Sequence, residues 1–142
     1  MVKQFAIFID GDNISCNHYE NVLSEVQSCG EIYETRVYAD WTEPNMKSWK
    51  EKLLRNPAIE FQAFRFQSNA TDNRIIMDAV EMIFLNPAIN AFCIASADSD
   101  YLFLAHRLRA RGKYILGIGG ADAKKEWREA CNNAEFFLKR EF

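Results

Sequence analysis

The chain has 142 residues, a length at which a single domain is expected. Its composition, with 49% hydrophobic, 13% aromatic and 26% charged residues, excludes a disordered chain or a coiled coil and supplies enough apolar side chains for a core. The net charge of −3 gives no overall field that attracts a polyanion, so any contact with nucleic acid must use a local basic patch.

The sequence contains no signal for a membrane span or for secretion. Its longest apolar runs have the length of a strand, whereas a membrane-spanning helix needs about 20 apolar residues. The first residues lack the apolar stretch and small-residue cleavage site of a signal peptide. The cysteines form no close pair and no Cys/His cluster; they are Cys16, Cys29, Cys93 and Cys131. We therefore expect a cytoplasmic protein with reduced thiols and no membrane partner.

Strand and helix patterns alternate along the chain. The predicted strands cover residues 4–9, 34–39, 59–66, 91–95 and 113–118, with a short last strand at 135–138. The predicted helices cover residues 17–28, 46–55, 70–85, 98–111 and 123–132. This alternation is typical of an α/β domain with a mainly parallel sheet of five to six strands, and one such domain accounts for residues 1–142.

Acidic residues directly follow two of the predicted strands. Asp10 and Asp12 come after the first strand, and Asp98 and Asp100 come after the fourth. In parallel α/β sheets, ligands bind at the carboxyl ends of the strands, especially where the strand order reverses. If the first and fourth strands are neighbours, these four carboxylates converge.

The predicted helix at 70–85 adds another carboxylate. Its apolar stripe consists of Ile75, Ile76, Ala79, Val80 and Ile83. Asp72 falls on the centre of this stripe at the amino end, so we expect it to point inward under the carboxyl edge of the sheet, where the helix dipole partly compensates its charge. Asp78 lies on the flank of the stripe, which indicates a supporting or structural role.

Such a group of acids favours a bound metal ion. Clustered carboxylates repel one another and resist desolvation, so they persist only when protonated or when a cation is bound. Hard oxygen ligands favour Mg²⁺ or Mn²⁺, and we expect Asp10, Asp72 and Asp98, with Asp100 as a further ligand, to hold one. A metal ion in such a site polarises a phosphodiester and lowers the pKa of an attacking water. Neither histidine has the setting of a catalytic triad.

Four short motifs occur in order along the chain. They are IFIDGDN at 7–13, VYADW at 37–41, NATD at 69–72 running on to Asp78, and ASADSDY at 95–101. Together they resemble the NYN domain of the PIN-like metal-dependent ribonucleases, and in particular its bacterial LabA-like branch. The resemblance extends from Phe5 to about Phe137. It implies a three-layer α/β/α fold with a central parallel sheet, and an acidic metal site that cleaves RNA.

The resemblance also implies roles for individual residues. By position, Asp10, Asp72 and Asp98 match the core metal-binding acids of the family, and Asp100 matches an additional acid. We predict that supporting or substrate-binding positions are taken by Asp12, Asn13, Asn69, Asp78, Ser96, Arg65 and Arg74. The two arginines flank the acidic segment in sequence and would guide an RNA backbone toward the metal.

Each of these residues also has a purely structural interpretation. Asp12 and Asn13 are common turn and helix-cap residues, residues 96–100 have the pattern of a helix cap, and Asp72 suits the first turn of a helix. Many relatives carry a basic residue where this chain has Ser68, and its absence implies weaker phosphate binding.

Two other functions fit parts of the pattern. The first is a catalytically silent RNA-binding or protein-interaction module, which Ser68 and the acidic composition permit. The second is a phosphatase of the haloacid dehalogenase type, suggested by the spacing of Asp10 and Asp12, although that family usually has Thr or Val where this chain has Ile14. The composition also permits a homodimer.

Overall fold

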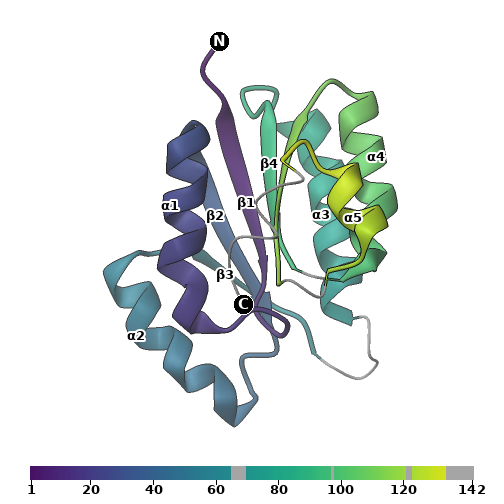
Figure 1. Cartoon of the computed structure of the whole chain (residues 1–142). Helices are drawn as coiled ribbons and strands as arrows, with labels where there is room; N and C mark the ends of the chain where they lie inside the picture. Colours follow the sequence, from purple (N-terminus) through teal and green to yellow (C-terminus); the bar gives the residue numbers. More distant parts are fainter. Residues whose placement is uncertain (65–69, 97, 121–122, 134–142) are drawn as a thin grey trace.

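The computed structural model describes residues 1–64, 70–96, 98–120 and 123–133 (Figure 1). Within them the strands are β1 (Gln4–Asp10), β2 (Glu31–Ala39), β3 (Ile59–Gln62), β4 (Ala91–Ala95) and β5 (Tyr114–Ile118). The helices are α1 (Tyr19–Cys29), α2 (Lys47–Arg55), α3 (Ala70–Leu85), α4 (Leu102–Ala110) and α5 (Lys125–Ala130). Three short 3₁₀ turns precede helices, at Cys16–His18, Pro44–Met46 and Ser99–Tyr101.

The strands form one parallel sheet in the order β3-β2-β1-β4-β5. The chain runs outward from β1 to β3 and then returns to the other side of β1 with β4. The strand order therefore reverses between β1 and β4, which is where ligands bind in sheets of this type. Helices α1 and α2 cover one face of the sheet, and α3 and α4 cover the other (Figure 1). The expected α/β sandwich with a parallel sheet is confirmed.

The core lies on both faces of the two central strands. Residues 5–9 of β1 and all of β4 have no exposed surface, as continuous apolar runs in a parallel sheet require. Aromatic rings cross the face that carries α3: Phe61 stacks on Tyr38 at 4.7 Å between ring centroids, Tyr38 on Phe8 at 5.9 Å, and Phe8 on Phe92 at 6.1 Å. This packing fixes the positions of the strand ends that bear the acidic residues.

Several element boundaries differ from the sequence-based ones. Strand β2 begins at Glu31 instead of residue 34, because Glu31 and Ile32 pair with the first residues of β1. Strand β3 ends at Gln62, because its partner β2 ends at the residue opposite, Ala39. The expected helix at 98–111 is a 3₁₀ turn followed by α4, and the chain turns after it at Gly112 with a positive φ of 78°.

Of the last two predicted elements, the structure describes only the helix. Helix α5 is shorter than the predicted range of 123–132, because Lys124 still has extended backbone. The predicted strand at 135–138 lies outside the described residues. Among the residues that are described, none of the helices has the length and apolar character needed to cross a bilayer.

Candidate metal centre

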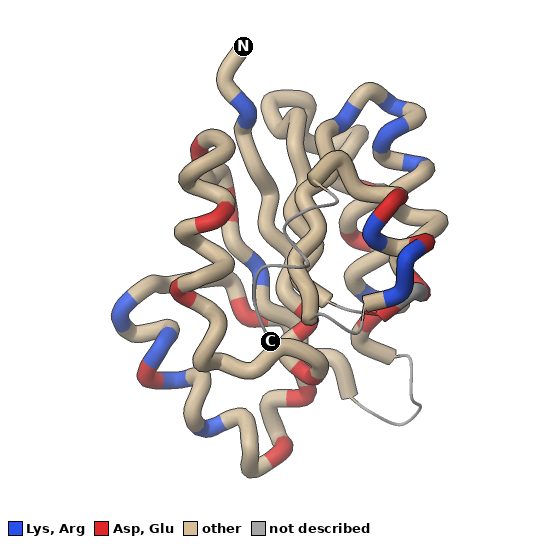
Figure 2. Tube along the Cα trace, in the orientation of Figure 1, with Lys and Arg blue, Asp and Glu red and all other residues tan. Residues whose placement is uncertain are grey.

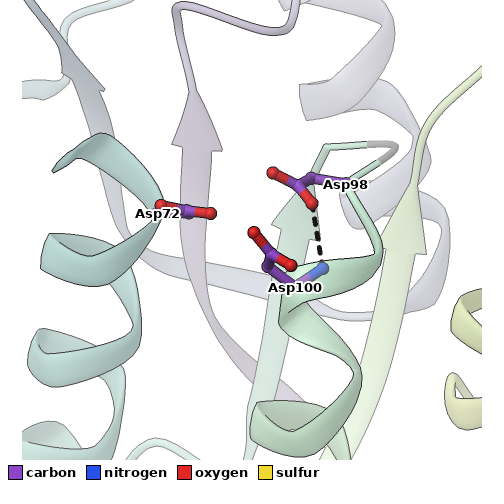
Figure 3. A group of neighbouring side chains, drawn as sticks. All are labelled: Asp72, Asp98 and Asp100. Atoms are coloured by element: carbon purple, nitrogen blue, oxygen red, sulfur yellow. Dashed lines mark hydrogen bonds between the residues drawn. The ribbon is translucent and has the colours of Figure 1, made fainter. Parts of the chain in front are cut away.

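Three carboxylates meet at the carboxyl edge of the sheet (Figure 3). Asp72 comes from the first turn of α3, Asp98 from the segment after β4, and Asp100 from the 3₁₀ turn before α4. One oxygen of each side chain lies within 4.8 Å of the other two. Because Mg²⁺ binds oxygen at about 2.1 Å, small side-chain rotations suffice to bring all three onto one ion. We call Asp72, Asp98 and Asp100 the carboxylate triad.

The turn after β4 orients two members of the triad. The backbone N–H of Asp98 donates to Oγ of Ser96 at 3.1 Å, and the backbone N–H of Asp100 donates to Oδ1 of Asp98 at 2.9 Å. Such side-chain to backbone bonds two residues apart are the usual way in which Asp and Ser stabilise tight turns. The same bonds direct the carboxylates of Asp98 and Asp100 toward α3 (Figure 3).

Asp72 is the buried member of the triad, with only 4% of its surface exposed. Burial raises the pKa of Asp72 to about 7, and the hydrogen bond with Asp100 and the charge of Asp98 add to the effect. A carboxyl group with this pKa holds a proton for much of the time near neutrality. A divalent cation compensates the same charges that the proton does, so the donor set fits a hard metal ion.

Asp10 lies beside the triad but is not a member of it. It ends β1 and is 5% exposed, and its Oδ2 accepts hydrogen bonds from the Tyr101 hydroxyl at 3.2 Å and from Ser96 Oγ at 3.4 Å. Burial, followed by the charge of Asp12, raises the pKa of Asp10 to about 6, and the charge of Asp98 contributes. Oδ1 of Asp10 is buried and has no hydrogen-bond partner among the described residues. Of the four expected metal ligands, three therefore form the carboxylate triad, and Asp10 lies beside it.

Asp12 and Asn13 belong to the loop that follows β1. Oδ2 of Asp12 accepts a hydrogen bond from the hydroxyl of Thr71 at 2.5 Å, and Oδ1 accepts one from the backbone of Asp40 at 3.4 Å. Asp12 therefore joins the loop to the start of α3 and to the end of β2. Asn13 is exposed, and its Oδ1 accepts from Ser96 Oγ at 3.2 Å. The supporting roles expected of Asp12 and Asn13 stay predictions.

Gly11 lets this loop pass close to β2. Its N–H donates to the carbonyl of Tyr38 at 2.7 Å, and a Cβ at this position would lie only 3.1 Å from the same oxygen. The loop therefore stays against the sheet edge, where Asp12 reaches Thr71.

Asp78 lies outside the triad and takes part in a separate network. Tyr38 donates its hydroxyl to Oδ2 of Asp78 at 2.7 Å, and the guanidinium groups of Arg36 and Arg74 lie 3.7 and 3.5 Å from the same oxygen. This network joins β2 to α3, and the supporting or structural role of Asp78 stays a prediction. Arg65, Ser68 and Asn69 lie outside the described residues.

Two contacts of the site were not anticipated from the sequence. Tyr101 is fully buried and binds Asp10, and Thr71 is buried and binds Asp12. Both residues are immediate neighbours of an acid in the motifs ASADSDY and NATD, and a polar residue next to a candidate site acid was the available signal.

Acidic residues gather near the carboxyl ends of the strands, whereas Lys and Arg are spread over α2, α4 and α5 (Figure 2). The carboxyl edge of the sheet is therefore a centre of negative charge. A phosphate group approaches such a centre only when a cation or a nearby arginine offsets the repulsion.

Comparison with known proteins agrees with this architecture. The model of the NYN domain family matches residues 4–138. A solved structure of a protein of unknown function from Vibrio parahaemolyticus has a TM-score of 0.71 and 18% identity, and the alignment covers 92% of this chain and 90% of that chain. At this identity the likeness shows a shared fold. Comparison with curated proteins gives no significant match.

Proposed function

Because this chain belongs to the NYN domain family, we propose that it is a divalent-metal-dependent ribonuclease that hydrolyses RNA phosphodiester bonds. The observation that carries this proposal is the carboxylate triad at the reversal of strand order. Three acids from two separate segments, the start of α3 and the turn after β4, lie within reach of one ion, and one of them is buried. Without a cation, this arrangement of carboxylates would be energetically unfavourable, because each carboxylate loses solvation in a partly buried place.

The proposed ligands are Asp72, Asp98 and Asp100, and the proposed cofactor is Mg²⁺ or Mn²⁺. When bound, such an ion polarises a phosphoryl oxygen and lowers the pKa of a water molecule. The backbone N–H groups of Asp98 and Asp100 donate turn bonds to Ser96 and Asp98, and these bonds would hold the ligands in place before the ion binds. Because the ligands are already positioned, the site loses less conformational entropy when it binds a metal and a phosphate.

Asp10 contributes a different atom to the proposed reaction. Its Oδ2 accepts hydrogen bonds from Tyr101 and Ser96, whereas its buried Oδ1 has no hydrogen-bond partner among the described residues and would be the atom that accepts a proton from an attacking water. In the metal-free protein, burial raises the pKa of Asp10 to about 6 and so brings it closer to neutral pH, where a base works best. We therefore propose that Asp10 is the general base that accepts the proton of the attacking water.

A cleavage assay with a fluorescent single-stranded RNA tests this function. Wild-type protein with Mn²⁺ is expected to cut the RNA, EDTA is expected to stop cleavage, and Asp72→Asn and Asp98→Asn are expected to lower the rate by about 100-fold or more. Glu129→Gln, an exposed carboxylate on α5, serves as the matched control and is expected to leave the rate unchanged. Full activity in both aspartate variants, or an inactive wild-type protein, would refute the proposal. RNA that is bound but left uncut even in the presence of Mn²⁺ would favour the silent binding module instead.

A further inference from the structure

An apolar groove lies on the side of α3 opposite to the triad. It has a volume of about 330 Å³ and is lined by residues 62–64, which follow the pairing part of β3, and by Ala70, Asn73, Arg74 and Met77 of α3. Two large apolar side chains are exposed here, Phe64 at 61% and Met77 at 68%. Exposed apolar surface of this kind, next to a functional centre, is typical of a binding site.

The groove and the triad share the first two turns of α3. Ala70 and Asn73, which line the groove, lie on either side of Asp72 in the sequence, and Asp72 points the other way into the triad. A helix is about 10–12 Å across, so the triad and the groove lie on two sides of one narrow element. A single RNA strand with a phosphate at the triad would need only a short further stretch to reach the groove.

Among the described residues that line the groove, Arg74 is the one that carries a positive charge. No carboxylate is present among the described lining residues. The guanidinium donates to the carbonyl of Gln62 at 3.3 Å and lies 5.7 Å from the ring centre of Phe61, which holds it at the groove wall. The contacts of Arg74 use its Nε, which faces Asp78, and its Nη1, which donates to Gln62, and 46% of the side chain is exposed, so a ligand can reach the guanidinium.

We propose that this groove binds a nucleobase of a single-stranded RNA substrate, with Phe64 stacking on the base and Arg74 contacting the adjoining phosphate. The inference rests on the proposed function, since it extends the substrate site of the same reaction. Aromatic side chains stack on any base, and an arginine contacts phosphate through its planar donors. The negative charge of the RNA backbone is complementary to the positive charge of Arg74. Because the protein has a net negative charge, RNA binding requires such a local cation.

A second groove, on the other side of the loop after β1, fits this role less well. It has a volume of about 310 Å³, and polar residues such as Asn13, Asn45 and Ser48 line it together with the buried Trp49. Its described lining residues include no lysine or arginine and expose no large apolar side chain. Of these two grooves, the one at Phe64 therefore suits a nucleotide better, because it offers an aromatic ring for the base and an arginine for the phosphate.

Fluorescence anisotropy with a short fluorescein-labelled single-stranded RNA of mixed sequence tests the inference. EDTA is present, so that the RNA stays intact. Phe64→Ala is expected to weaken binding by about 5- to 150-fold, the range that loss of one stacked base produces, while Phe64→Tyr is expected to bind as wild type does. Arg74→Gln is expected to weaken binding and to reduce the slope of log K against log salt by about 0.7.

Matched controls come from other surfaces of the chain. Phe103→Ala removes a phenylalanine on α4 that is 79% exposed, and Arg55→Gln removes an arginine on α2 that pairs with an acid four residues away, as Arg74 does. Both are expected to bind RNA as wild type does. All variants change exposed side chains, so thermal unfolding is expected to be nearly unchanged.

Several results would overturn the inference. They are a wild-type protein that binds no RNA, groove variants that bind as wild type does, and a wild-type dimer that Phe64→Ala converts to a monomer in sedimentation. The last result would assign the groove to a second copy of this chain.

The cleavage assay separates this inference from the proposed function. RNA binding that depends on Phe64 and Arg74, without cleavage in Mn²⁺, would uphold the groove and refute the ribonuclease. Cleavage that requires Asp98, together with RNA binding that does not require Phe64 or Arg74, would uphold the ribonuclease and refute the groove.

Discussion

The hydroxyl of Tyr101 donates a hydrogen bond to Oδ2 of Asp10 at 3.2 Å, and both side chains are buried. Burial, together with the charge of Asp10, raises the pKa of Tyr101 well above its usual value, so the phenol remains a donor at any working pH. The contact fixes the Asp10 carboxylate with its second oxygen, Oδ1, unpartnered among the described residues. Tyr101 is therefore a positioning residue for Asp10.

Replacement of this phenol tests its role. Tyr101→Phe removes a hydrogen bond that lowers the pKa of Asp10, so the pKa is expected to rise above its present value of about 6. The acid limb of the pH–rate profile is expected to move to higher pH, and the cleavage rate near neutrality to fall about tenfold or more, as loss of a hydrogen bond to a charged group predicts. Tyr33→Phe, an exposed tyrosine on β2, is the control. An unchanged profile in Tyr101→Phe would remove the positioning role.

The raised pKa of Asp10 also makes the metal-free protein less stable as the pH increases. Its folded-state pKa of about 6 lies above the usual 3.8, so the folded state binds the proton more tightly than the unfolded state does. The free energy of unfolding therefore falls, through this group, as the pH rises from about 4 to about 7. Asp72, with a pKa of about 7, acts in the same direction.

Asp10→Asn is expected to remove the contribution of Asp10. In EDTA the variant is expected to be more stable than wild type at about pH 8 by about 1–3 kcal/mol, and to differ little at about pH 4. Urea unfolding at the two pH values measures the difference. A wild-type protein that is the more stable of the two at pH 8 would contradict the desolvation of Asp10.

Metal binding is expected to reverse this loss of stability. A ligand that binds only the folded state stabilises it by about 2.7 kcal/mol at a concentration 100 times its Kd, which raises the unfolding temperature by several degrees in a domain of this size. Mn²⁺ is expected to produce this shift in the wild type and none in Asp98→Asn, while Glu129→Gln is expected to behave as wild type. Equal shifts in wild type and Asp98→Asn would show that the ion binds elsewhere.

The bond from Thr71 to Asp12 is expected to hold the loop after β1 against α3. Thr71→Val keeps the shape of the side chain but removes the donor, at a cost of about 1–3 kcal/mol in the free energy of unfolding. Thr71→Ser keeps the hydroxyl and is expected to lose less. Urea unfolding of the two variants compares them. If valine and serine are equally tolerated, Asp12 is held by its other contacts.

Much of this site was predictable because local sequence patterns indicate where a strand ends and which face of a helix is buried. An apolar run followed at once by Asp10 places this acid at the carboxyl edge, and the same reasoning places Asp98 there. The inward direction of Asp72 followed from its position on the apolar stripe of α3. The neighbouring positions of β1 and β4, which the sequence left conditional, complete the arrangement.

Other features depend on three-dimensional packing and were not predictable. Asp10 stands apart from the triad because Tyr101 and Ser96 bind its carboxylate, and no local pattern shows which partner a buried acid has. The groove at Phe64 also joins two distant segments, the end of β3 and the outer side of α3. Its exposed phenylalanine follows a strand and has the pattern of an ordinary core residue.

The metal site itself can be located by anomalous diffraction from crystals of the wild-type protein grown with Mn²⁺. We expect one strong anomalous peak among the carboxylates of Asp72, Asp98 and Asp100, at bonding distance from their oxygens, with Asp10 close by. Ordered crystals in Mn²⁺ that show no peak at this place, or a peak bound by other residues, would contradict the metal-dependent ribonuclease.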